Sequence, residues 1–315
     1  MSEPATEPAP SLLWDITRYV IVAILIGIPI YYYGFHSPTV FVSREHTGKT
    51  VGTDYIVKVA QFPETGDWQG IADEIQDKLD ALEQIMSIHR YDSEVSRFNA
   101  FTSTEDWFPV SREIAQVIYT ALEISRLTKG AFDITIVPLQ EQTGYEKLSV
   151  RLDPPALKKT MPDLTIDLSA IAKGFAVDSI AALLDGHRIT DYFIEVGIVA
   201  RGKGRRNRER DWIVGIEKPS PDQLLGLHQT FPLKDQSLAK SGSHPIQISG
   251  VDELASVSVL APTCTRADAL TTAMLVLGEQ KGLELANRHG IAVLFLLRYG
   301  GEIREIPSNY WGNKN

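Results

Sequence analysis

The chain has 315 residues, of which 43% are hydrophobic, and it carries 31 basic and 40 acidic side chains. This length accommodates one large domain or two lobes with a substantial core. The net charge of -9 argues against a nucleic-acid-binding protein, because such proteins usually present a basic surface. The single cysteine, Cys264, excludes an intrachain disulfide framework and a metal site built from several cysteines. Its place beside an apolar run favours a small core residue over a nucleophile.

Residues 1–18 form a leader that begins with many Pro, Ala and Glu residues, a composition that predicts disorder. The run Tyr19–Phe35 has no charged residue and is near the lower length limit for crossing a bilayer. Tyr31, Tyr32 and Tyr33 resemble an interfacial aromatic belt. The alternatives are a cleaved signal peptide and a buried helix. The leader is acidic and no Ala-x-Ala site follows the run, so we expect an uncleaved single-pass anchor and a folded domain over 36–315.

The first part of the domain alternates between strand-like and helix-like patterns. Thr53–Ala60 alternates as a strand does. From Ile71 to Met86, apolar residues recur at helical spacing with acidic residues opposite. His89–Asn99 is polar and is expected to be a loop. Ile114–Leu127 repeats the helical pattern, and Gly130 offers a C-terminal stop.

The stretch Asp167-Leu-Ser-Ala-Ile-Ala-Lys-Gly-Phe-Ala-Val-Asp178 combines a helix period with unusual residues. A short strand, Leu164–Asp167, is expected to run into a helix over Ser169–Leu184, with Ser169 capping its first amides. Gly174 costs about 1 kcal/mol in a helix relative to Ala, which predicts a close backbone approach at this position. Lys173, near the helix N-terminus, makes a positive region that suits phosphate. The alternative is a buried strand–helix unit with a lysine at its edge.

The C-terminal half reads as strands joined to two helices. Strands are expected at Tyr192–Val196, Ile198–Lys203, Trp212–Glu217, Ala255–Ala261 and Ile291–Leu297. The basic run Arg201–Arg210 is interpreted as a solvated hairpin turn rather than an anion site. Helices are expected at Arg266–Leu277 and Gly282–His289. Asp268 and Thr272 are four residues apart, so the first of these helices places both oxygens on one face, where they suit Mg²⁺. Most such pairs are surface or cap residues.

Six ordered motifs resemble those of the ApbE-type FAD:protein FMN transferases, and the resemblance covers about residues 47–297. These motifs are Gly48–Thr53, Ser93–Asn99, Gly130–Asp133, Asp167–Gly174, Trp212–Pro219 and Ala267–Ala273. The resemblance implies an α+β fold with a mixed, mainly antiparallel sheet and packed helices, in two lobes with FAD between them. The N-terminal transmembrane helix would precede this fold.

The resemblance also implies a reaction. FMN would pass from FAD to a Ser or Thr hydroxyl of an acceptor flavoprotein of a membrane redox system, with Mg²⁺ required and AMP released. The domain would face outward from a bacterial inner membrane, and would be periplasmic where the cell has two membranes. Asp268, Thr272 and the carbonyl of Ala170 would hold the metal. The FAD contacts would be Val51, His89, Ala131, Phe132, Asp133, Asp167 and Lys173.

Within this set, Asp268 would act through the metal and Lys173 would offset phosphate charge or hold the nucleotide. Phe132 could offer a stacking surface and Asp133 a ribose acceptor; the alternatives are a buried phenylalanine and a capping aspartate. Val51 stands where the family usually has methionine, and His89 stands where tyrosine is common.

Some family features are absent. The Trp-Gly-Phe-Gly stretch after Leu139 is missing, and Glu195-Val-Gly-Ile198 lacks the second glycine of the usual Glu-x-Gly-Gly. The His-Ile-Ile-Asp-Pro stretch is also missing. Ser243-His244 is its candidate remnant, with His244 as a catalytic residue or an exposed loop histidine. Two further functions therefore stay open, a non-catalytic relative that binds flavin or a partner, and a FAD pyrophosphatase.

Overall fold

The computed structural model describes residues 24–25, 40–135, 144–207, 210–218, 226–240, 253–299 and 302–312. The predicted leader, nearly all of the predicted anchor and the candidate residue His244 lie outside this part of the chain. Within it, no helix is both long and apolar enough to cross a membrane. The chain divides into two compact units, and the larger one, Val42–Phe62 with Gly66–Asn315, contains the sites considered below.

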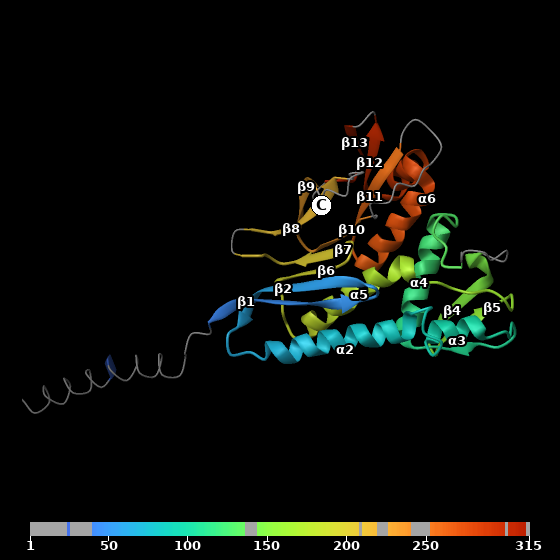
Figure 1. Ribbon diagram of the computed structural model, residues 1–315, viewed down its shortest axis with the longest axis horizontal. Helices are drawn as coiled ribbons and strands as arrows, with labels where there is room; N and C mark the ends of the chain where they lie inside the picture. Colours follow the sequence, from blue (N-terminus) through green and yellow to red (C-terminus); the bar gives the residue numbers. More distant parts are fainter. Residues whose placement is uncertain are drawn as a thin grey trace, which may run out of the picture. The chain divides into compact units, whose positions relative to one another are not determined.

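An eight-stranded sheet is the centre of the larger unit (Figure 1). Its strands, in spatial order, are β1 (Phe41–Thr50), β2 (Thr53–Pro63), β6 (Tyr192–Val196), β7 (Val199–Lys203), β10 (Gln236–Lys240), β11 (Glu253–Ala261), β12 (Ala292–Tyr299) and β13 (Glu302–Pro307). From β2 to β13 every neighbouring pair is antiparallel. The predicted α+β fold with a mainly antiparallel sheet is therefore confirmed.

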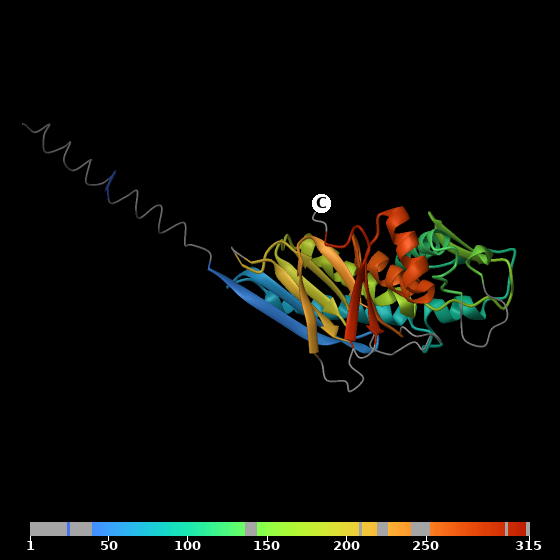
Figure 2. The same ribbon diagram turned by 90° about the horizontal axis from the view of Figure 1, so that it is seen from above.

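Helices and two smaller sheets surround this sheet. The helices are α2 (Trp68–Met86), α3 (Glu94–Ala100), α4 (Arg112–Leu127), α5 (Ser169–Gly186) and α6 (Cys264–His289). The smaller sheets are β3 (Phe108–Pro109), β5 (Pro155–Lys159) and β4 (Leu148–Leu152) in one, and β8 (Trp212–Lys218) with β9 (Gly226–Leu233) in the other. In both views, β4 and β5 lie beside α4 (Figures 1 and 2).

Alternating side chains give the large sheet two buried faces. Ile194 and Val196 of β6 belong to the large core cluster that the helices cover, whereas Phe193 belongs to a second cluster. The second cluster includes Trp212 of β8 and Leu233 of β9. Because successive residues of a strand point to opposite faces, one sheet supports both a helical layer and the β8–β9 hairpin.

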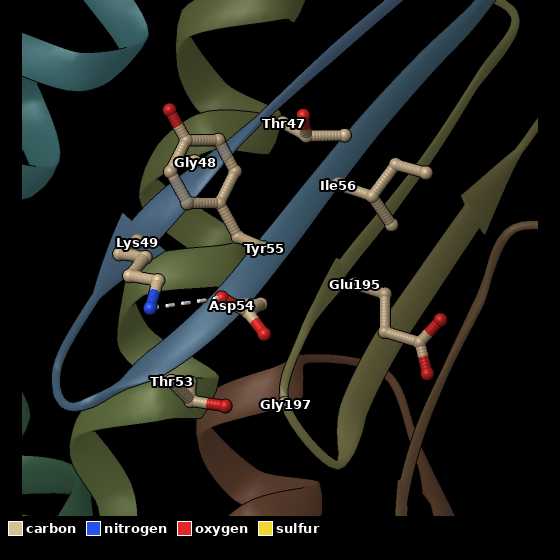
Figure 3. A pocket seen from close by; sticks show the side chains of 9 residues that line it. All are labelled: Thr47, Gly48, Lys49, Thr53, Asp54, Tyr55, Ile56, Glu195 and Gly197. Carbon is tan, nitrogen blue, oxygen red and sulfur yellow. Dashed lines mark ion pairs between the residues drawn. The ribbon is translucent and has the colours of Figure 1, made fainter.

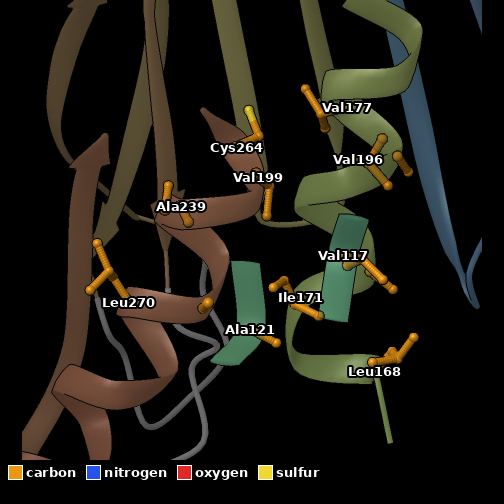
Figure 4. Packing of buried hydrophobic residues seen from close by; sticks show 14 of the residues in the cluster. Val117, Ala121, Leu168, Ile171, Val177, Val196, Val199, Ala239, Cys264 and Leu270 are labelled. Atoms are coloured by element: carbon orange, nitrogen blue, oxygen red, sulfur yellow. The ribbon is translucent and has the colours of Figure 1, made fainter. Parts of the chain in front are cut away.

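Helix α5 is buried on nearly all sides, which is typical of a helix inside the core. Figure 4 shows its residues Ile171 and Val177 among side chains of α4, α6 and the large sheet. Both are fully buried. Cys264 at the start of α6 is also fully buried, and burial raises the pKa of its thiol well above the ordinary value. The prediction that Cys264 is a small core residue is therefore confirmed.

The segment His89–Asn99 is only partly the predicted loop. The Ser93 side chain accepts a hydrogen bond from the Ser96 amide at 2.9 Å and caps helix α3. Val95 and Phe98, three residues apart, bury one side of this short helix. The prediction of a loop was therefore wrong beyond Ser93. The cap and the two buried side chains stabilise a helix of about two turns there.

The predicted strand Leu164–Asp167 is wrong, because these residues join no sheet. The Asn99 side chain takes the place of a neighbouring strand. Its Oδ1 accepts the Ile166 amide at 2.9 Å, and its Nδ2 donates to the Ile166 carbonyl at 3.0 Å. The segment is thus buried and extended but held by a side chain.

The other predicted helices and strands are present, Tyr192–Val196 with its predicted bounds and the rest with shifted ends. The two helices predicted at the C-terminus are the two parts of α6, which is interrupted at Gly278 by a φ of 71°. Of the basic run, Arg201–Lys203 belong to β7 and are partly or fully buried, whereas the described residues that follow form a mostly exposed turn between β7 and β8, in which the Arg206 amide donates to the Arg210 carbonyl at 2.9 Å. The predicted solvated turn is therefore confirmed only for the part of the run after Lys203, and the two strands that it joins belong to different sheets.

Candidate active site at the contact of α5 and α6

At Gly174 the backbone of α6 packs directly against α5. A Cβ atom at this position would lie 2.6 Å from the carbonyl carbon of Cys264 and 2.8 Å from the Cα of Thr265. Real Cβ atoms do not approach backbone atoms this closely, so only glycine fits. The predicted close backbone approach is confirmed, and the approaching group is the first turn of α6.

Asp268 of α6 points its carboxylate at this contact. Its side chain is 4% exposed, and its Oδ2 accepts a hydrogen bond from the Gly174 amide at 3.0 Å. Burial raises the pKa of Asp268 to about 6, although Lys173 and the Gly174 amide act in the opposite direction. A buried carboxylate with one backbone donor is a strong site for a cation, because a positive charge would offset the cost of burial.

Thr272 follows Asp268 by one turn of α6, as the spacing predicted. It is half-buried, and its hydroxyl donates to the backbone carbonyl of Asp268 at 3.5 Å. Among the described residues no group of three or more His, Cys, Asp or Glu side chains could hold a metal ion. A cation at Asp268 would therefore take its other protein ligands from a hydroxyl and a backbone carbonyl.

The first turn of α5 supplies such a carbonyl. In an α-helix the amide of Gly174 bonds the carbonyl of Ala170, four residues earlier. Here the same amide donates to Asp268, so the carboxylate competes with Ala170 for it. Lys173 is half-buried, and its Nζ donates to the Ser169 carbonyl at 3.3 Å. Ala170, Lys173 and Asp268 thus belong to one cluster at the α5–α6 contact.

Asp167 caps this end of α5. Its Oδ1 accepts the Ser169 amide at 2.8 Å, whereas Ser169 itself is exposed. The prediction that Ser169 caps the helix was therefore wrong. Ser169 is the first residue of the helix rather than the residue before it, so its hydroxyl is not at the position from which a side chain caps the free amides.

Asp133 and Phe132 have structural roles. Oδ1 of Asp133 accepts the amide and the hydroxyl of Thr135 at 2.8 and 2.7 Å, and Oδ2 accepts the Tyr145 amide at 2.9 Å. Phe132 is 1% exposed and packs in the large core cluster. This burial agrees with the alternative of a buried phenylalanine, and the predicted FAD contact at Phe132 stays a prediction. Ala131 beside it is half-buried.

Val51 and His89 lie on two turns. Val51 has a φ of 48°, in the left-handed region that β-branched residues avoid, and it is followed by Gly52 at 72°. His89 is exposed on the loop after α2, and its amide donates to the Ser87 hydroxyl at 3.2 Å. Among the described residues, no direct hydrogen bond joins Val51, His89 or Asp133 to the α5–α6 cluster.

A cavity of about 630 Å³ lies beside the Val51 turn (Figure 3). Its lining residues are Thr47, Gly48, Lys49, Thr53, Asp54, Tyr55, Ile56, Glu195 and Gly197. Lys49 reaches across to Asp54 at 4.0 Å, and Glu195 lies 3.6 Å from Lys240. The cavity includes parts of two motifs, Gly48–Thr53 and Glu195–Ile198, but Asp268 does not line it.

Sequence reasoning missed a buried lysine that holds the segment before α5. Lys159 is fully buried, and its Nζ donates to the carbonyls of Leu164, Phe98 and Asn99 at 2.9, 3.3 and 3.4 Å. It also lies 5.1 Å from the centre of the Phe98 ring. Burial lowers its pKa. Lysine is almost always exposed, so its position in the sequence gives no signal for this role.

Replacing Lys159 by methionine is expected to lower the free energy of unfolding by about 3 kcal/mol, since three carbonyls lose their donor while the chain volume is kept. Chemical denaturation measures this. Lys158→Met is the matched control, because Lys158 is half-buried on the same strand and lacks such contacts among the described residues. An equal loss of unfolding free energy in both variants would contradict the role of Lys159 in holding the segment before α5.

The raised pKa of Asp268 predicts a pH dependence of stability in protein freed of metal with a chelator. The folded-state value of about 6 exceeds the ordinary 3.8, so the folded state binds more protons between these values. This group's stabilisation is therefore present below pH 4 and is lost as the pH rises to about 6. Each pKa unit is worth about 1.4 kcal/mol, which gives about 3 kcal/mol in total. The measurement is the unfolding free energy of wild type and of Asp268→Asn from pH 4 to 8. The difference between the two proteins at each pH gives the contribution of the Asp268 carboxyl group.

Comparison with known proteins identifies the family. A model of the ApbE family matches residues 51–295. The chain belongs to the ApbE family. A protein of Vibrio cholerae serotype O1 named FAD:protein FMN transferase is 32% identical over 302 residues, covering 84% of this chain and 90% of that protein. The protein of the same name from Escherichia coli K12 is 30% identical, with coverage of 82% and 85%.

Solved ApbE structures share the fold. The flavin transferase ApbE from Vibrio cholerae superimposes with a TM-score of 0.76 at 32% identity, covering 86% of this chain and 99% of that one. The apo form of the Pseudomonas stutzeri flavinyl transferase ApbE gives a TM-score of 0.75 at 28% identity, with coverage of 86% and 95%. The resemblance inferred from the six motifs is confirmed, and the large antiparallel sheet with its helices is the ApbE fold.

Proposed function

We propose that this chain is an FAD:protein FMN transferase, which moves FMN from FAD to a Ser or Thr hydroxyl of an acceptor protein and releases AMP. Membership of the ApbE family and the names of its relatives support the class of reaction. The observation that carries the proposal is the buried Asp268 carboxylate, held against the first turn of α5 by the Gly174 amide.

The reaction breaks the bond between the two phosphates of FAD, and its catalysis is mainly positioning and neutralisation of charge on phosphate oxygens. The residues present fit Mg²⁺, because Asp268, Thr272 and the Ala170 carbonyl are all oxygen donors and the carboxylate is buried with one amide donor. Bound there, Mg²⁺ would polarise the phosphate oxygens. The protein's own part is to hold these donors at the contact of two helices.

Lys173 would add positive charge beside the phosphates. Its Nζ extends along the first turn of α5, where it bonds the Ser169 carbonyl. Its charge already lowers the pKa of Asp268 against the effect of burial, so the two groups interact electrostatically. The free amides at this end of α5 favour negative charge as well, and Asp167 holds one of them in place.

The test is incubation of the full chain in detergent with FAD, Mg²⁺ and an acceptor flavoprotein fragment, followed by intact-mass spectrometry. Acceptor mass increased by FMN, with equimolar AMP, supports the proposal. FMN and AMP without labelled acceptor would instead indicate a FAD pyrophosphatase. FAD that binds and stays unchanged would indicate a non-catalytic relative.

For localisation, we propose that Tyr19–Phe35 is an uncleaved single-pass anchor and that the domain lies outside the cytoplasm. The absence of charge over this run and the acidic leader support it. The partner would then be a flavoprotein of a membrane redox system. Recovery of the full chain in membranes after alkaline washing, with protease access from the outer side, tests the topology; release into the soluble fraction would contradict it.

A further inference from the structure

A second carboxylate on α5 binds the start of α6. Asp178 Oδ1 accepts the amide of Cys264 at 2.9 Å, and Oδ2 accepts the amide of Thr265 at 2.8 Å and its hydroxyl at 2.6 Å. These are the first amides of α6, which have no partner within their own helix. Asp178 therefore caps α6 from the neighbouring helix, and its negative charge lies at the favourable end of the helix dipole.

Arg201 of β7 holds Pro262, two residues before the start of α6. Its Nη1 donates to the Pro262 carbonyl and to the Ser237 hydroxyl, each at 3.0 Å, and lies 3.8 Å from Asp178 Oδ1. Both charged side chains are about one-fifth exposed. The junction between β11 and α6 is thus fixed to α5 and to the large sheet at once.

These contacts extend the site by one helical turn. Asp178 follows Gly174 by four residues on α5, and Asp268 follows Cys264 by four residues on α6. Residues four apart share a helix face. The helices are therefore joined at two successive turns, by the amide of Gly174 on Asp268 and by Asp178 on Cys264. A shift of the start of α6 would carry Asp268 away from Gly174.

We propose that Asp178 is a positioning residue, which sets the Asp268 carboxylate against the first turn of α5 by fixing the N-terminus of α6. This rests on the proposed function in that Asp268 is taken as the ligand of a divalent cation. Asp178 is not itself a ligand, because both its oxygens are bonded to the start of α6.

The test compares Asp178→Ala with wild type, using Mn²⁺ as the probe in titration calorimetry. Loss of a group that orients a metal ligand typically weakens binding tenfold or more, so the dissociation constant is expected to rise about tenfold. The half-saturating Mg²⁺ in the transfer assay is expected to rise as much, and saturating Mg²⁺ to restore the rate. Asp178→Asn keeps one acceptor oxygen, so its Mn²⁺ dissociation constant is expected to lie between those of wild type and Asp178→Ala.

Asp185→Ala is the matched control. Asp185 lies at the other end of α5, where its Oδ1 accepts the Tyr192 hydroxyl at 3.0 Å and Lys203 Nζ at 2.8 Å. The Asp185→Ala variant is expected to lose about as much stability as Asp178→Ala, while its Mn²⁺ affinity stays that of wild type. Wild-type affinity in Asp178→Ala, or an equal loss in Asp185→Ala, would overturn the proposal.

Amide hydrogen exchange decides the same point without metal. In Asp178→Ala, peptides that cover 262–272 and Gly174 are expected to exchange faster, whereas Asp185→Ala leaves them protected. Failure of wild type to bind Mn²⁺ would remove the metal from the proposed function, and the exchange data would still decide the positioning. Unchanged protection in Asp178→Ala would overturn it.

Discussion

Asp268→Asn is expected to lower the rate of FMN transfer at least about a thousandfold at any Mg²⁺ concentration. The substitution keeps the shape of the side chain and an acceptor for the Gly174 amide, and it removes the one buried carboxylate of the cluster. A cation acting on phosphate oxygens supplies several kcal/mol to such a reaction, and each 1.4 kcal/mol is tenfold in rate. The mass increase of the acceptor with time measures the effect.

The same variant should be more stable than wild type when metal is removed, which separates loss of chemistry from loss of fold. At pH 8 wild type carries a buried charge that the amide side chain of the variant lacks, and the pKa of about 6 sets its cost near 3 kcal/mol. Chemical denaturation with a chelator present provides the comparison. Retained transfer activity would mean that Asp268 is not the metal ligand, and a less stable variant would mean that its burial is not costly.

The elements that could be predicted are those whose pattern is local. In α2 the buried residues Ile75, Leu79 and Leu82 recur at helical spacing, so the sequence shows both the helix and its inner face. Helix α5 could be predicted as a helix, but its buried surroundings follow only from the elements packed on every side. The extended segment at Ile166 could not be predicted from the sequence, because the side chain that bonds its backbone is Asn99, 67 residues earlier.

The candidate site shows the same division. The spacing of Asp268 and Thr272 predicts one helix face, and Gly174 predicts a close approach, since both signals lie within one helix. The bond that joins Asp268 to Gly174 spans 94 residues, and the bonds of Asp178 to α6 span 86 and 87. No local pattern encodes such contacts. The family motifs include Gly174 and Asp268, but Asp178 lies outside them, and nothing in its local sequence shows that it caps a helix.

Gly174→Ala is expected to lower the free energy of unfolding by about 3 kcal/mol, at the upper end of the cost of inserting a methyl group into a packed core. The new Cβ would meet the backbone of Cys264 and Thr265, and a backbone cannot rotate away as a flexible side chain can. Relief requires α6 to move from α5, which would stretch the bond from the Gly174 amide to Asp268. Chemical denaturation and Mn²⁺ calorimetry together should therefore show lower stability and weaker binding.

Gly186→Ala is the control within the same helix. A Cβ at Gly186 meets nothing within 4 Å, so this variant gains about half a kcal/mol from the higher helix propensity of alanine and keeps its Mn²⁺ affinity. A Gly174→Ala variant as stable as Gly186→Ala would show that the helices can separate freely. In that case the glycine of the motif would serve a ligand's approach, and the two-turn contact between α5 and α6 would not be what orients Asp268.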